Sequence, residues 1–154
     1  MYDAIDSAKK ELSRADHLFH VSLKYTRTGD TLNLIIKRLM NAIDFGIEAL
    51  LRDAKEKEQI PSIPTLPIAR INKIRNLYSE DKLIKNIMEF YLLLRKISKS
   101  RTECVLEFRR HVTMTCHFDA DKIEITIDII GDYYKKTKEF INHIEQILSK
   151  DGDN

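Results

Sequence analysis

The residues that could do chemistry in this 154-residue chain are concentrated in one short run, from Glu107 to His117. Within this run Arg109 and Arg110 are followed directly by His111, and His117 comes six residues after that. Arginine supplies a permanent, forked positive charge for a phosphate, and histidine titrates near neutral pH, so it can accept or donate a proton. Two guanidinium groups beside two imidazoles are what RNA cleavage without a metal requires, because arginine stabilises the phosphate as charge builds up on it.

Positive charge gathers in the middle of the chain, although the formal net charge is only +2. Residues 1–65 are balanced, residues 66–111 carry a net charge of +6, and residues 112–154 carry a net charge of −4. A basic middle segment beside an acidic end could steer a polyanion to one face, or the two segments could pair with each other. The candidate nucleic-acid contacts in this basic segment are Arg95, Lys96, Lys99 and Arg101.

The composition argues against several classes of protein. An apolar fraction of 43% is enough for a core, and no stretch is long and apolar enough to predict a transmembrane span or a secretory signal. Two cysteines, Cys104 and Cys116, cannot form a disulfide scaffold, so we expect reduced thiols and a cytoplasmic protein. The four glycines are isolated, which argues against a phosphate loop, and we expect no cofactor. His17 and His20 lack further ligands at matching spacing, so we expect no metal site.

Apolar residues that recur every three or four positions predict a mainly α-helical bundle. A first long helix is expected over residues 2–28, with Gly29 ending it and one of the next two residues capping the second helix. The second pattern, over residues 32–54, is stronger, and the short turn between the two predicts an antiparallel pair of long helices. Gly46 lies inside the second pattern, where it indicates close approach of another helix rather than a break.

Three prolines separate this pair of helices from shorter middle helices. Residues 59–66 are expected to form an extended connection, Pro67 to begin a short helix, and Ser79 to cap the next one. Residues 98–102 are typical of a loop.

The period changes to two near residue 112, which predicts one small β-hairpin over about 112–127, and a C-terminal helix follows. The whole is predicted as a single domain over residues 1–150, with a frayed tail at 151–154.

This helix order, together with an arginine, a polar residue and a later histidine, resembles the HEPN superfamily. That family carries an arginine, four to six intervening residues and a histidine, and Arg110, His111 and His117 match the longest spacing. The resemblance implies a homodimeric helical bundle with two facing motifs, and metal-independent RNA cleavage in active members. Inactive members serve as binding or antitoxin-associated modules. It also implies that Arg110 stabilises the phosphate and that His117 or His111 acts as base or acid, with Arg109 assisting.

The predicted strand bears on which residues can act together. Residues seven apart share one face of a helix, whereas in a strand they point to opposite faces. If residues 112–118 form a strand, His111 and Arg109 become the alternative pair to Arg110 and His117. A purely structural interpretation also stands, in which Arg109, Arg110 and His111 cap a helix end or form ion pairs with the acidic C-terminal third.

Two functional hypotheses follow. The first is an RNA-associated HEPN-like protein, which in its enzymatic form is a metal-independent endoribonuclease; whether the protein is an enzyme stays open. The second is a non-catalytic dimeric helical module whose basic middle segment binds RNA, the ribosome or a protein partner. In both cases we expect a homodimer, because the apolar stripes on the long helices are wide and a lone hairpin needs a partner edge. No membrane association is expected.

Overall fold

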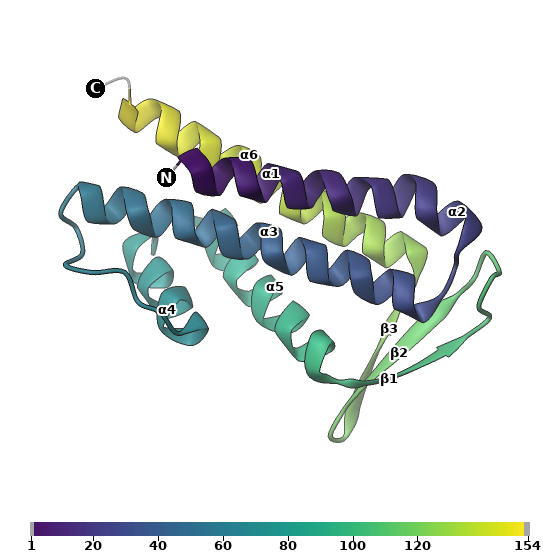
Figure 1. Ribbon diagram of the computed structural model, residues 1–154. Coiled ribbons are helices and arrows are strands. Elements are labelled where there is room, and N and C mark those ends of the chain that lie inside the picture. Colours follow the sequence, from purple (N-terminus) through teal and green to yellow (C-terminus); the bar gives the residue numbers. More distant parts are fainter. Residues whose placement is uncertain (1, 153–154) are drawn as a thin grey trace.

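The computed structural model of this chain describes residues 2–152, with side chains up to Lys150. The mainly α-helical bundle predicted from the sequence is confirmed, with a small antiparallel sheet at one end (Figure 1). Its elements, in chain order, are α1 (Tyr2–His17), the π-helical turn η1 (Leu18–Ser22), α2 (Leu23–Tyr25), α3 (Gly29–Glu56), α4 (Pro67–Leu77), α5 (Lys82–Lys99), β1 (Arg101–Val105), β2 (Thr113–Phe118), β3 (Asp121–Ile125) and α6 (Ile127–Gly152).

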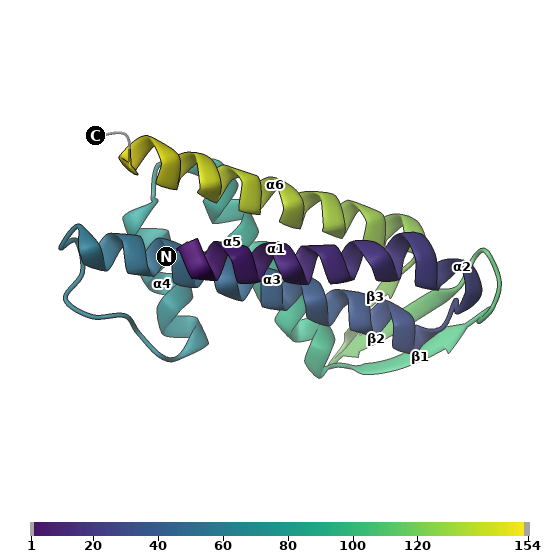
Figure 2. The same cartoon turned by 45° about the horizontal axis from the view of Figure 1, so that its top comes forward.

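The three long helices α1, α3 and α6 lie side by side along the molecule, with α1 antiparallel to the other two (Figure 2). Small side chains on α1 allow close packing, since Ala8 and Ala15 are fully buried. Within the described residues, no helix is long and apolar enough to cross a membrane. Helix α6 continues through Gly152, into the segment predicted as a tail, and residues 153–154 lie outside the described residues.

Gly46 lies where α3 packs against α6, as the sequence predicted. A Cβ atom at this position would lie 2.8 Å from Ile144 Cδ1 and 2.9 Å from Phe140 Cε2. Both of these side chains are fully buried, so they have little room to move. Glycine is therefore required here for the close approach of the two helices.

The junction between the first two long helices differs from the prediction. The first helix does not continue to residue 28 but passes through η1 and ends with α2 at Tyr25. Gly29 is the first residue of α3 rather than the end of the preceding helix, and its φ is not positive. The cap is Thr28, whose Oγ1 accepts a hydrogen bond of 3.2 Å from the Thr31 N–H. Gly29 is needed for space, because a Cβ there would lie 3.1 Å from Cys104 Cβ.

Pro67 begins α4, as predicted, but α5 begins later than expected. Its cap is Asp81 and not Ser79: Asp81 Oδ1 accepts a hydrogen bond of 3.1 Å from the Ile84 N–H. The other carboxylate oxygen of Asp81 lies 2.7 Å from His143 Nε2 on α6. One carboxylate thus caps α5 and joins it to α6.

The predicted hairpin is present as β2 and β3, but it belongs to a three-stranded antiparallel sheet in the order β1-β2-β3. The interpretation of residues 98–102 as a loop was therefore wrong: α5 extends to Lys99, and β1 begins at Arg101. Strand β1 pairs with β2 so that Arg101 lies opposite His117. The buried face of the sheet packs on the helices through Met114, Cys116 and Ile125, which are fully buried.

Candidate functional site

The loop between β1 and β2, residues 106–112, is fixed onto the connection between α2 and α3. The Phe108 N–H donates a hydrogen bond of 2.7 Å to the carbonyl oxygen of Arg27. One residue earlier, Glu107 Oε1 accepts a hydrogen bond of 3.3 Å from the Gly29 N–H at the start of α3. Two turns close the loop on itself, because the Arg109 N–H bonds to the Leu106 carbonyl at 3.1 Å and its own carbonyl accepts from Val112 at 3.2 Å.

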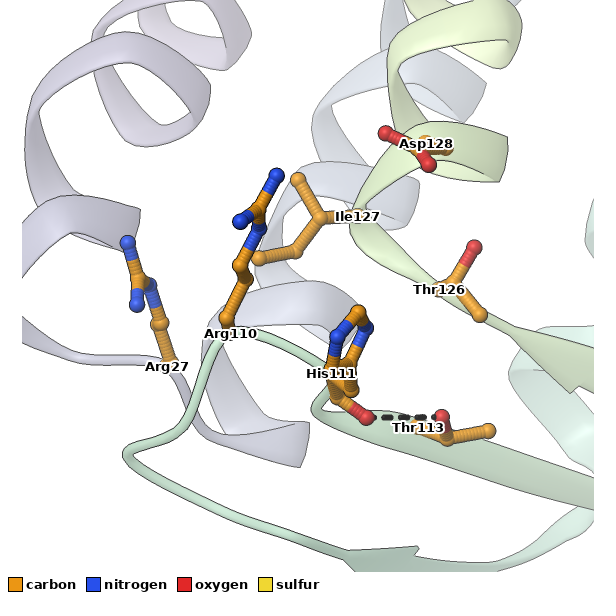
Figure 3. A pocket seen from close by; sticks show the side chains of 7 residues that line it. All are labelled: Arg27, Arg110, His111, Thr113, Thr126, Ile127 and Asp128. Carbon is orange, nitrogen blue, oxygen red and sulfur yellow. Dashed lines mark hydrogen bonds between the residues drawn. The ribbon is translucent and has the colours of Figure 1, made fainter.

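A pocket of about 390 Å³ opens beside this loop (Figure 3). Three parts of the chain that are remote in sequence form it: the α2–α3 connection, the β1–β2 loop with the start of β2, and the start of α6. Its lining residues are Arg27, Arg110, His111, Thr113, Thr126, Ile127 and Asp128. The side chains of Arg27 and Arg110 extend in the same direction from facing segments.

The pocket is electropositive. Arg27 and Arg110 carry two permanent positive charges against the single carboxylate of Asp128, so the sum is positive even when His111 is neutral. The first turn of α6 adds to this field, because the amides at the start of a helix lack intrahelical partners and the helix dipole is positive there. Thr126 caps α6 by accepting a hydrogen bond of 3.3 Å from the Ile129 N–H. The arrangement suits a bound anion.

His111 supplies the imidazole of this pocket. The hydroxyl of Thr113 donates a hydrogen bond of 3.0 Å to the His111 carbonyl, which fixes the backbone where the loop enters β2. The residue is exposed, so its ring is accessible to a ligand. Arg110 and His111, two residues that the sequence singled out, are thus brought together.

His117 lies elsewhere. It faces the same side of β2 as Thr113 but four residues further along, which corresponds to roughly 13 Å. An acidic row separates the two, because Glu103 and Glu124 both lie opposite Thr115 in the sheet register. His117 Nε2 is buried, and Glu103 Oε2 lies 3.5 Å from it without forming a hydrogen bond. The structure therefore does not bring Arg110 and His117 into one cleft within a single chain.

The remaining predicted residues do not line the pocket. Arg109 is exposed on the loop beside Arg110, and its backbone closes the two turns. The predicted nucleic-acid contacts occupy the end of α5 and the start of β1. Arg95 lies over the ring of Tyr91 at 5.9 Å and Lys96 over the ring of Phe118 at 5.4 Å, while Lys99 is exposed and Arg101 lies 3.9 Å from Glu103.

Sequence reasoning missed Arg27 and the start of α6. Arg27 is more than eighty residues from Arg110 in the chain, and no local pattern connects them. Thr126 could have been recognised from the sequence as a helix cap before Ile127. That this helix begins beside the basic loop follows only from the tertiary fold.

The two thiols and the surface histidines do not form a second reactive site. Burial, reinforced by the carboxylate of Glu107, raises the pKa of Cys104 to about 11, so this thiol is a poor nucleophile at neutral pH. His20 Nδ1 lies 2.6 Å from Asp16 Oδ1 on the surface. Among the residues that the structure describes, no three His, Cys, Asp or Glu side chains are placed to hold a metal ion.

Comparison with known proteins places the chain in no family: no family model, curated protein or solved structure matches it.

Proposed function

We propose that this protein binds RNA and that the pocket of Arg27, Arg110 and His111 holds a phosphate of the RNA backbone. The observation that carries this proposal is the convergence of two guanidinium groups and an imidazole at the first turn of α6. A guanidinium group can bind a phosphate through two parallel N–H···O hydrogen bonds, and helix N-termini attract anions. Arg109, exposed on the adjoining loop, offers a further phosphate contact outside the pocket, as expected for a polymeric ligand.

Binding without cleavage is the form of this function that the geometry supports best. Cleavage of RNA without a metal uses one group that removes the 2′-hydroxyl proton and another that protonates the leaving oxygen. Within one chain the pocket holds one histidine, His111, and His117 lies beyond the acidic row of Glu103 and Glu124. A HEPN-like nuclease would need a second copy to complete the site. The homodimer, the HEPN-like identity and a cytoplasmic location stay predictions from the sequence.

The proposal is tested by fluorescence anisotropy with a labelled 20-nucleotide RNA in the presence of a chelator. We expect Arg110→Ala and Arg27→Ala each to weaken binding at least tenfold. Arg52→Ala is the matched control, because it removes one exposed positive charge at the far end of α3, where Arg52 pairs with Glu48 at 2.9 Å. Each lost phosphate contact should also lower the slope of log affinity against log salt concentration by about 0.7 for a single strand.

Two results would overturn the proposal. One is absence of RNA binding by the unmodified protein, and the other is equal weakening by Arg52→Ala and Arg110→Ala, which would mean that only net charge matters. Gel electrophoresis of the same samples examines cleavage. If the unmodified protein forms RNA cleavage products and His111→Ala does not, the pocket is catalytic and the proposal of binding without cleavage is wrong.

A further inference from the structure

We propose that Phe108 is a stacking surface for an unpaired RNA base beside the phosphate pocket, so that the protein selects single-stranded over double-stranded RNA. This inference rests on the proposed RNA binding and adds to it the form of RNA that is recognised. It starts from the exposure of the phenyl ring: Phe108 is 68% exposed, although a phenylalanine of a folded domain is ordinarily buried.

The backbone of Phe108 is joined to a residue of the pocket. Its backbone N–H donates to the carbonyl of Arg27, which is itself a lining residue, and Arg110 follows two residues later. Arg109 lies between them and is exposed. The exposed ring therefore belongs to a loop that carries two arginines and is joined through its backbone to a third.

The backbone at Phe108 has a conformation that residues other than glycine rarely adopt. Phe108 has a φ of 63° and Leu106 a φ of 57°, both in the left-handed region that favours glycine. The hydrogen bonds to Arg27 and Gly29 keep the loop in this shape. Strained backbone of this kind is concentrated at binding sites, where it fixes a side chain in place before the ligand arrives. A backbone already fixed at Phe108 reduces the conformational freedom that is lost on binding.

An exposed aromatic ring on the same loop as exposed arginines matches the chemistry of a single-stranded nucleic acid. The arginines contact the phosphates, and the ring offers a flat apolar face on which a base stacks without regard to its identity. In a duplex the bases are already stacked and paired, so their faces are not available to the ring. The positive charge of Arg27, Arg109 and Arg110 favours this ligand over an apolar protein surface, which would leave these guanidinium groups without anionic partners.

The test compares binding of a labelled 12-nucleotide single strand and a 12-base-pair RNA duplex. We expect Phe108→Ala to weaken binding of the single strand by about 5- to 100-fold and to change duplex binding less than twofold. Phe108→Trp keeps a stacking surface and should retain single-strand affinity. Leu66→Ala removes another exposed apolar side chain, 70% exposed and remote from the loop, and should leave both affinities unchanged. Thermal unfolding of each variant verifies that it is folded.

The outcomes separate this inference from the proposed function. If Arg110→Ala weakens binding of both RNAs but Phe108→Ala changes neither, the phosphate pocket stands and the stacking role is overturned. Equal loss of single strand and duplex in Phe108→Ala would also overturn it. If light scattering shows that Phe108→Ala converts a dimer into a monomer, the ring belongs to a protein contact and the inference is wrong. No RNA binding by the unmodified protein would overturn both.

Discussion

The backbone N–H of Phe108 and the carbonyl oxygen of Arg27 are joined by a hydrogen bond of 2.7 Å, which fastens the β1–β2 loop to the α2–α3 connection. Through this contact an arginine from the α2–α3 connection and the arginine–histidine pair of the loop reach the same pocket. The basic site is thus a consequence of tertiary packing rather than of a continuous sequence motif.

The left-handed backbone at Phe108 predicts that glycine at this position gives a more stable protein than alanine does. Replacing Phe108 by glycine should give a protein about 1 kcal/mol more stable than the Phe108→Ala variant, because glycine adopts a φ of 63° without steric cost. Urea unfolding followed by circular dichroism measures the difference. Alanine is the proper reference, since both substitutions remove the same exposed ring. A glycine variant less stable than the alanine variant would show that the loop stores no strain.

The crowding around Gly46 predicts that Gly46→Ala destabilises the protein by about 1–2 kcal/mol, although alanine favours helix more than glycine does. The reason is the added Cβ atom, which would lie within 3 Å of both Ile144 and Phe140. Thermal or urea unfolding provides the measurement. Gly131→Ala is a matched control on α6: its Cβ would lie 3.1 Å from the ring of Phe19, which is only partly buried and can move, so we expect a smaller loss or none.

The lowered pKa of Asp81 predicts that its contribution to stability depends on pH. Burial alone would raise the pKa of this carboxyl, but hydrogen bonds from His143 and from the Ile84 N–H outweigh it and lower the pKa below 3.8. A lowered pKa in the folded state means that the stabilisation is present above about pH 3.8 and is lost as pH falls through the folded-state pKa.

We therefore expect Asp81→Asn to be about 1 kcal/mol less stable than the unmodified protein at pH 7, with the difference shrinking below pH 3.8. Urea unfolding at pH 7 and at pH 3 measures it. Ser79→Ala, at the cap that the sequence predicted, should change the free energy of unfolding by less than about 0.5 kcal/mol at either pH. A larger effect at Ser79 than at Asp81 would place the cap where the sequence suggested it.

The helices were predictable because their apolar periodicity is long and strong, and Gly46 and Pro67 had their roles correctly inferred from position alone. The strand β1 was not predictable. Its residues alternate between exposed and half-buried positions and include Arg101 and Glu103, so no apolar alternation marks it. It becomes a strand because β2 offers it a free edge.

The candidate site also has a part that the sequence predicted and a part that it did not. The run from Arg109 to His111 was visible as a dense group of phosphate-binding and titratable residues, and Arg110 and His111 do share a pocket. His117 was grouped with them by spacing along the chain, whereas the extended geometry of β2 carries it away. Arg27 and the first turn of α6 enter the site through long-range packing, which local patterns do not encode.

The most direct test of the central claim is an NMR titration of the ¹⁵N-labelled protein with a short single-stranded RNA, which maps the binding site residue by residue. We predict that the largest amide shifts occur at Arg27, in the loop from Leu106 to Thr113, and in the first turn of α6. The same titration of Arg110→Ala should show these shifts strongly reduced. Shifts centred instead on Arg95, Lys96 and the end of α5, with the Arg110 pocket unaffected, would contradict the assignment of this pocket as the phosphate site.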